Sequence, residues 1–230
     1  MSSSPIAPIS TIDSSTNSPS PPDAVVRHGT PEDTVGVISC GALAAQVRAI
    51  ARRRGWPVVV YPLPPLLHNR PVRIARAVEE FARGLASRHA TVAVAYADCG
   101  TYGALDRVCE SLGIRRLEGA TCYDVLSGPD AIADLFEEEP GTYLLTDFLV
   151  RGFHRLVWNE LGLDRHPELR DDYFAHYRRV VWLAGHRSAD LERSARDAAA
   201  MLGLPLTIVA VGEARLERAL EALVAERVAS

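Results

Sequence analysis

Residues 91–108, TVAVAYADCGTYGALDRV, contain a strand, a turn and the start of a helix. The apolar run predicts a buried strand over residues 91–99, and the pattern that follows predicts a helix over about 102–112 that Gly113 ends. The same order of apolar strand, polar turn and helix recurs at residues 35–50, 143–157 and 180–195. Strands that are apolar along their whole length are typical of a parallel sheet with helices on both faces.

The rest of the chain extends this pattern. Further strands are predicted over residues 35–40, 57–64, 114–119, 142–148, 178–185 and 206–212, with helical stretches between them. Strand–helix–strand connections are right-handed, which places the helices in layers above and below the sheet. We therefore expect an α/β fold with one open, mostly parallel sheet of about six strands, in a Rossmann-like or flavodoxin-like layering.

The composition excludes several classes of function. All 25 basic residues are arginines, so mechanisms that need a lysine, such as Schiff-base chemistry, are excluded. The net charge of -4 offers no electrostatic case for a nucleic acid or an anionic membrane as partner. No run approaches the ~20 apolar residues of a membrane span. The usual glycine-rich nucleotide-binding motifs and serine-hydrolase motifs are also absent.

The N-terminal residues differ in composition from the rest. Residues 1–33 are rich in Ser, Pro and Thr and have neither an early basic residue nor the apolar core of a secretory signal. We expect a disordered tail over 1–33 and a single α/β domain over 34–230. Without an export signal, a cytoplasmic location is expected, and the four cysteines are then reduced thiols or ligands.

Three of the four cysteines, Cys40, Cys99 and Cys122, fall at the ends of predicted strands. Ligands of open α/β sheets bind beyond the carboxyl ends of the strands. Cys40 and Cys99 each precede a glycine and open a predicted helix, whose N-terminus should lower the thiol pKa and favour the thiolate. Two interpretations stay open, a shared three-thiolate site or unrelated core cysteines. Cys109 lies on an apolar helix face and is interpreted as packing.

His68, in the segment LLHNRP, is the histidine best placed to join these thiols. Three cysteines and one histidine are a standard closed zinc site. Their spacing matches no zinc finger, so the fold would have to assemble the site. The alternative for His68 is a helix cap or a surface loop. Its neighbours Asn69 and Arg70 are candidates for binding an anionic group of a cofactor or substrate, although a solvated Arg70 is the competing interpretation.

A second group of polar residues follows the strand predicted at 142–148. Asp147 ends that strand, and Arg151 and His154 follow at helical spacing, which would place all three on one helix face. Asp147 and His154 are candidates for proton transfer and Arg151 for cofactor binding, against the alternative that Asp147 is an ordinary helix cap. Asp98, which directly precedes Cys99, is a further candidate catalytic residue.

The ordered set of motifs resembles a known bacterial and archaeal family, domain of unknown function 1638. The resemblance covers roughly residues 35–220 and rests on the segments CGAL, LHNRP, YADCGTYGALD, GATCYD, EPGTYLLTDFLVRGFHRLV and GLDRHPELRDDYF. It implies the α/β fold and the same strand-end site. It also implies a link to corrinoid-dependent methyl-transfer proteins, and so to one-carbon chemistry.

These observations support three functional hypotheses. The first is a metal-dependent enzyme with a small-molecule substrate, in which Zn²⁺ on the four ligands activates a substrate thiol for methyl transfer, or in which the three thiolates hold a [4Fe–4S] cluster. The second is a non-catalytic accessory protein that handles a metal or a corrinoid, with a corrinoid or methyltransferase protein as partner. The third is metal-free chemistry with Cys99 as nucleophile and Asp98 or His68 as its partner.

Overall fold

The computed structural model describes residues 33–228, in which seven parallel strands form two separate sheets. The first sheet has the order β2-β1-β3-β4 and the second the order β5-β6-β7. The strands are β1 (Val35–Ser39), β2 (Val58–Pro62), β3 (Thr91–Ala95), β4 (Arg115–Arg116), β5 (Thr142–Thr146), β6 (Arg179–Ala184) and β7 (Leu206–Ala210). The predicted disordered tail over residues 1–33 lies, apart from Asp33, outside the described residues.

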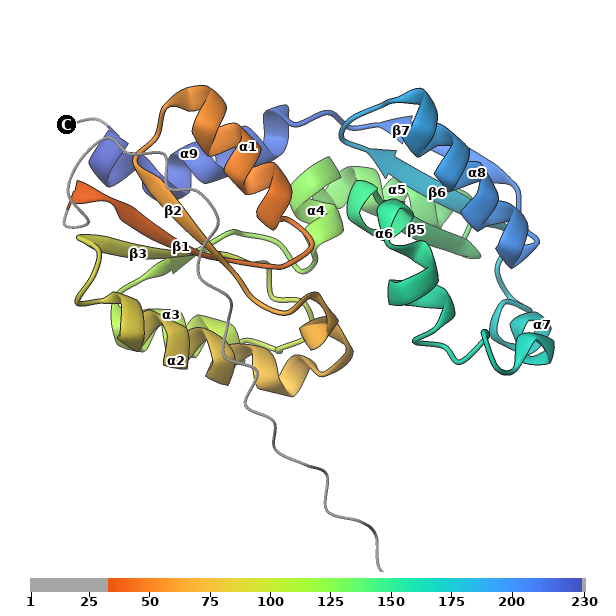
Figure 1. Cartoon of the computed structure of the whole chain (residues 1–230), viewed down its shortest axis with the longest axis horizontal. Coiled ribbons are helices and arrows are strands. Elements are labelled where there is room, and N and C mark those ends of the chain that lie inside the picture. Colours follow the sequence, from red (N-terminus) through yellow and green to blue (C-terminus); the bar gives the residue numbers. More distant parts are fainter. Residues whose placement is uncertain (1–32, 229–230) are drawn as a thin grey trace, which may run out of the picture.

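Helices cover both faces of each sheet (Figure 1). The α-helices are α1 (Ala44–Arg54), α2 (Ile74–Leu85), α3 (Ala104–Leu112), α4 (Cys122–Ser127), α5 (Pro129–Glu138), α6 (Asp147–Arg151), α7 (Arg170–Tyr173), α8 (Ala189–Leu202) and α9 (Ala214–Val228). We call each sheet with the helices that cover it a half of the molecule. In the first half, which contains the sheet β2-β1-β3-β4, α2 and α3 pack on one face and α1 and α9 on the other. The predicted α/β class is therefore confirmed.

The structure differs from the predicted single sheet of about six strands, because the seven strands of residues 33–228 are divided between two sheets. Strand β4 is only two residues long and pairs with β3 alone, so it closes the first sheet. The chain then forms α4 and α5 before β5, which pairs only with β6. The sequence pattern could not reveal this break because each strand carries the same apolar signature whichever neighbour it pairs with.

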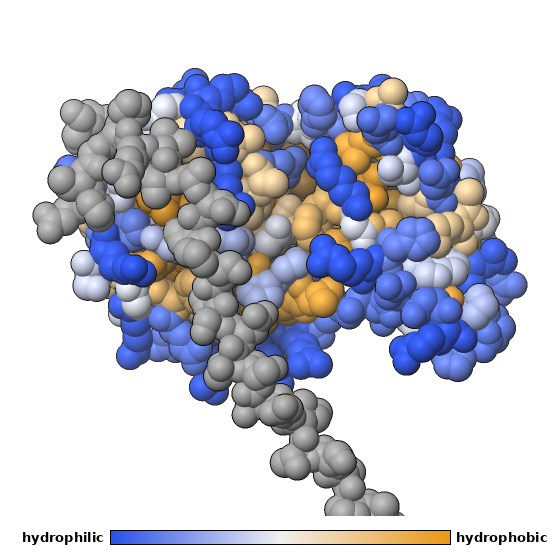
Figure 2. Space-filling view, in the orientation of Figure 1, coloured by the Kyte–Doolittle hydropathy of each residue, from blue (hydrophilic) through white to orange (hydrophobic). Residues whose placement is uncertain are grey.

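In the second sheet, successive residues of a strand point to opposite faces, and helices cover both faces. Leu145, Val180 and Trp182 face the cluster formed with α6 and α8. Leu144 and Val181 belong to the opposite cluster, which includes residues of α4 and α5. In the space-filling view, hydrophilic residues cover the rim of the molecule, whereas apolar residues are visible in its middle (Figure 2).

The last helix returns from the second sheet to the first (Figure 1). Leu216 and Leu220 of α9 are buried in the core of the first half. On the outer side, Arg53 of α1 forms ion pairs with Glu213 and Glu217, at 2.8 and 2.5 Å. Because α9 follows β7 in sequence but packs on the first sheet, the two halves are held by a crossing chain as well as by side-chain contacts. The single domain expected over residues 34–230 stays a prediction.

The turn after β6 is built on a buried carboxylate. Asp147 is 4% exposed and accepts hydrogen bonds from Trp182 Nε1 at 2.9 Å and from the amides of Gly185 and His186 at 3.2 and 2.8 Å. A methyl group on Gly185 would lie 2.7 Å from the side-chain nitrogen of Gln46 in α1. This turn of the second half therefore lies against the first half.

We expect Asp147→Asn to lower the free energy of unfolding by about 1.5–3 kcal/mol, because hydrogen bonds to a charged acceptor are lost and a buried donor is left facing another. Urea unfolding followed by circular dichroism measures this. Asp197→Asn, on the exposed side of α8, is the matched control and should shift stability by less than about 0.5 kcal/mol. Equal effects of the two substitutions would contradict the buried anchoring role.

Candidate metal centre

Cys40 lies at the carboxyl end of β1 and is buried, with 1% of its surface exposed. Its amide donates to the carbonyl of Ala95 at the end of β3, at 2.9 Å. Burial raises the pKa of the Cys40 thiol, and hydrogen bonds from the amides of Ala42 and Leu43 and from the Tyr96 hydroxyl partly offset that rise. Three donors thus already point at the sulfur and would stabilise a thiolate there.

His68 faces the Cys40 sulfur. Its Nε2 lies 3.7 Å from Cys40 Sγ, and its Nδ1 lies 3.1 Å from the carbonyl oxygen of Pro65. Since a carbonyl only accepts, the proton resides on Nδ1 and the Nε2 lone pair faces the sulfur. Burial lowers the pKa of His68, which keeps the ring neutral. Metal-binding histidines are oriented in this way, with the second nitrogen donating to a carbonyl.

Gly41 explains why a glycine follows Cys40. A Cβ at this position would lie 2.5 Å from the carbonyl oxygen of Leu63 and 2.9 Å from the nitrogen of Pro65. These are backbone atoms of the connection that leads from β2 to His68, so they cannot rotate away. The absent side chain at Gly41 lets the segment that carries His68 approach Cys40.

Cys99 occupies a strained turn after β3. Its φ of 50° is left-handed, as is the φ of 51° at Tyr102, and side chains other than glycine rarely adopt this region. The Asp98 carboxylate holds the turn by accepting from Thr101 Oγ1 at 2.5 Å and from the amides of Gly103 and Tyr102 at 3.0 and 3.1 Å. Asp98 therefore acts as a loop anchor for Cys99, and strain of this kind is typical of functional sites.

Two backbone hydrogen bonds join this turn to the segment before α4. The amide of Asp98 donates to the carbonyl of Gly119 at 3.0 Å, and the amide of Cys99 donates to Ala120 at 2.7 Å. Cys122 is the first residue of α4, whose start is fixed by a capping box between Thr121 and Asp124. The Cys122 amide hydrogen-bonds the Cys99 sulfur and favours its thiolate. These contacts bring two cysteines 23 positions apart in sequence into one local structure.

The three thiols interact electrostatically. Burial and then the charge of Cys40 raise the pKa of Cys99 to about 12, and burial followed by Cys40 and Cys99 raises that of Cys122. The sequence-based expectation that helix N-termini lower these pKa values is therefore wrong, because desolvation of the thiolate outweighs the helix ends. Cys99 and Cys122 are half-buried, so the cluster has an accessible side.

The donor chemistry of this cluster fits a metal, but its geometry is not preassembled. Among residues 33–228, no three His, Cys, Asp or Glu side chains are arranged to hold a metal ion. All four cysteines are free thiols. A bound cation would have to displace the thiol protons and draw the sulfurs toward it.

Tyr96 belongs to the site and was missed in the sequence. It is fully buried, its ring stacks on His68 with centroids 5.4 Å apart, and its hydroxyl lies 3.5 Å from His68 Nδ1. Burial, followed by the neighbouring cysteines, raises its pKa, so the phenol stays neutral and can donate. The available signal was a polar aromatic as the last residue of the apolar run TVAVAY.

Cys109 packs into the core of the first half on α3, as its place on an apolar helix face indicated.

Asn69 and Arg70 lie on the surface beside His68. The Asn69 amide donates to Glu160 Oε2 at 3.1 Å and so links the two halves, whereas Arg70 is exposed at the end of the short 3₁₀ turn that carries His68. Their role in binding a cofactor stays a prediction.

The structure does not place Asp147, Arg151 and His154 on a shared face. Helix α6 ends at Arg151, and a π-helical segment follows from His154 to Trp158. Asp147 is buried, and its carboxylate accepts hydrogen bonds from Trp182 and from the turn after β6. Arg151 and His154 are exposed. The spacing argument assumed a continuous α-helix. It holds for Asp147 and Arg151, which both lie within α6, but not for His154, which lies in the π-helical segment beyond Gly152.

The family comparison supports the resemblance that the sequence motifs indicated. The model of the family described as Protein of unknown function (DUF1638) matches residues 62–220. The chain belongs to this family. The DUF1638 match includes His68, Cys99 and Cys122 but begins after Cys40, so the segment CGAL lies outside it. No curated protein and no solved structure matches the chain.

We expect Gly41→Ala to destabilise the protein by about 1–3 kcal/mol, because the new methyl group meets backbone atoms that can move only with the whole segment. Gly84→Ala is the matched control, since a Cβ there has nothing within 4 Å and the residue lies in the last turn of α2. It should change stability by less than about 1 kcal/mol, in the stabilising direction. Chemical unfolding of both variants measures the difference, and an unchanged Gly41→Ala protein would contradict the close approach.

Proposed function

We propose that this protein is a metal-dependent enzyme whose Zn²⁺ is held by Cys40, Cys99, Cys122 and His68. The observation that carries the proposal is the cluster of three electrostatically coupled thiols next to an imidazole whose Nε2 lone pair faces one sulfur. The burial that keeps these thiols neutral makes their thiolates unfavourable unless a partner compensates the negative charge. A divalent cation is such a partner, and Cys₃His is a standard zinc ligand set.

The proposed reaction is methyl transfer to a thiol of a small-molecule substrate, linked to one-carbon or corrinoid metabolism. Zinc, when bound, would supply a positive charge that lowers the pKa of a substrate thiol, provided that this thiol takes the place of one of the four protein ligands. The residues of the chain then have distinct tasks. Asp98 holds the Cys99 turn, Tyr96 and the amides of Ala42 and Leu43 donate to the Cys40 sulfur, and the half-buried Cys99 and Cys122 leave the substrate side accessible.

A [4Fe–4S] cluster on the three cysteines is the second candidate. One observation favours it: the electrostatic coupling connects Cys40, Cys99 and Cys122 with each other, whereas the direct contact of His68 is with Cys40. Three cysteines from separate loops would leave one iron for substrate. An accessory protein that handles a metal or corrinoid would use the same ligands.

Metal-free nucleophilic chemistry at Cys99 has less support. A reactive cysteine needs a lowered thiol pKa, usually from a cation or a helix end. Burial, Cys40 and Asp98 instead raise the pKa of Cys99 to about 12.

The proposal places the protein in the cytoplasm, where free thiols persist. The proposed partners are the small-molecule substrate and a corrinoid or methyltransferase protein. In the described part of the chain, no helix has the length and apolar character needed to cross a membrane.

Removal of any ligand should abolish stoichiometric metal binding. We expect anaerobically purified Cys40→Ala, Cys99→Ala and Cys122→Ala proteins each to lose bound metal or to bind it at least tenfold more weakly. Cys109→Ala is the matched control, because Cys109 is buried in the core away from the cluster. Elemental analysis together with the visible absorption spectrum separates colourless zinc protein from a brown iron–sulfur protein. A metal-free wild-type protein, or metal retained in all three variants, would overturn the proposal.

Metal binding should release protons. The raised thiol pKa values mean that the metal-free sulfurs are protonated between pH 6 and 8, while the neutral His68 has no proton on Nε2 to lose. Each sulfur that binds therefore loses one proton, and the zinc affinity should rise by up to about tenfold per pH unit for each. Calorimetry in buffers of different ionisation enthalpy counts these protons. A zinc affinity independent of pH would contradict thiolate ligation.

A further inference from the structure

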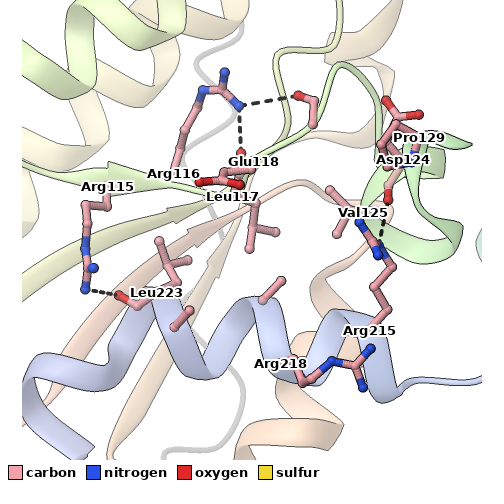
Figure 3. A pocket seen from close by; sticks show the side chains of 13 residues that line it. Arg115, Arg116, Leu117, Glu118, Asp124, Val125, Pro129, Arg215, Arg218 and Leu223 are labelled. Carbon is pink, nitrogen blue, oxygen red and sulfur yellow. Dashed lines mark hydrogen bonds between the residues drawn. The ribbon is translucent and has the colours of Figure 1, made fainter.

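A cavity of about 530 Å³ lies between α9 and the segment that joins β4 to α4 (Figure 3). Leu117 and Val125 form part of its apolar wall, and Arg215 and Arg218 extend from α9 along its other side. Its volume falls within the range of pockets that hold small molecules. The thiol cluster does not contribute to its lining.

The lining of this cavity is positively charged, although the chain as a whole is acidic. Its charged lining residues are Arg115, Arg116, Arg215 and Arg218 against Glu118 and Asp124. The chain itself has a net charge of -4. Four arginines against two acids around one concave surface produce a local field that attracts anions.

Some of these groups are already committed to partners in the protein. Arg116 forms a two-pronged ion pair with Asp106, with N–O distances of 2.6 and 3.1 Å. The Asp124 carboxylate accepts from the amide and the hydroxyl of Thr121. The positive charge that remains for a ligand is therefore on Arg215 and Arg218 of α9 and on Arg115, which donates to the carbonyl of Leu223 at 3.1 Å.

The two arginines of α9 keep most of their donors. Arg215 donates from Nε to the backbone carbonyl of Asp124 at 3.2 Å, which leaves its terminal nitrogens available. Arg218 is exposed and, within residues 33–228, forms no hydrogen bond or ion pair. One helical turn separates these residues, and both line the same cavity.

A second observation marks the same place as a binding site. Arg215 and Arg218 also line an adjoining cavity of about 520 Å³, together with Ser127. Ser127 Oγ is the one buried side-chain polar atom in the described residues without a hydrogen-bond partner. Asp134 and Glu138 line this second cavity too, but Glu138 is paired with Arg179. Buried polar atoms are normally satisfied, so the Ser127 hydroxyl is a donor that lacks its acceptor.

Helix α5 begins beside Arg215 without a side-chain cap. The N-cap of α5 is Gly128, which has no side chain to accept from the first amides of the helix. A Cβ on Gly128 would lie 3.2 Å from the guanidinium carbon of Arg215. The guanidinium group, the helix start and Ser127 are thus neighbours, and all of them prefer an anionic oxygen.

We propose that these cavities bind a small molecule with a multiply charged oxyanion group, a phosphate ester or a polycarboxylate. Arg215 and Arg218 bind its charged oxygens, and the Ser127 hydroxyl donates a further hydrogen bond. Leu117 and Val125 contact its less polar part. This site is independent of the proposed metal centre.

Calorimetric titration of the full chain with orthophosphate, glycerol 3-phosphate, succinate and tricarballylate tests the site. We expect saturable binding of at least one of them, weakened at least tenfold in both Arg215→Gln and Arg218→Gln and several-fold in Ser127→Ala. Arg83→Gln, which removes the same charge from the exposed surface of α2, is the control and should bind as the wild type does. Circular dichroism confirms that the variants fold.

The relative affinities of the four compounds identify the class of ligand. Tighter binding of the phosphates assigns a phosphate ester to the site, and tighter binding of the carboxylates assigns a polycarboxylate. The proposal is overturned if none of the four compounds binds saturably, or if Arg83→Gln weakens binding as much as the α9 variants do. Because the titrations need no metal, their failure leaves the metal proposal intact.

Discussion

The parallel pairing of β1 with both β2 and β3 is the constraint on which the candidate site depends. In this register Ser39 lies opposite Pro62 on one side and Ala95 on the other, so three strands end at the same level. The residues that follow each strand therefore meet at one edge of the sheet. Cys40, His68 and Cys99 all come from these continuations, and the hydrogen bond from Cys99 to Ala120 adds the segment that carries Cys122.

The chemistry of the sulfur cluster follows from its desolvation. Burial raises the thiol pKa of Cys40, Cys99 and Cys122, and each negative charge would make ionisation of the others harder. The metal-free cluster is therefore neutral, and only a cation makes several thiolates favourable together. The left-handed φ at Cys99 adds strain that the Asp98 hydrogen bonds maintain. Neutral thiols, a neutral imidazole and a rigid turn together suit a metal better than they suit a free nucleophile.

The segment between β4 and α4 connects the two proposed sites. Glu118 and Gly119 line the arginine-rich cavity, while the next residue, Ala120, accepts the hydrogen bond from Cys99. Arg215 holds the carbonyl of Asp124 within the helix that Cys122 begins. Helix α9, which returns to the first sheet from the second, thus contributes both the arginines of the cavity and a contact to the metal-site helix.

The sequence by itself determined the α/β class, a helix ending at Gly113, the packing role of Cys109 and the family, because apolar periodicity and ordered motifs are local properties of the chain. The helix predicted over about 102–112 begins at Ala104 in the structure. Only the tertiary structure decided which strands pair. It split the predicted sheet at the two-residue β4 and separated buried Asp147 from exposed Arg151 and His154. It also showed that the thiol pKa values are raised, where the sequence predicted that they would be lowered, because desolvation depends on neighbours that are distant in sequence. For the same reason, only the structure revealed Tyr96 beside His68 and the arginines that line the cavity.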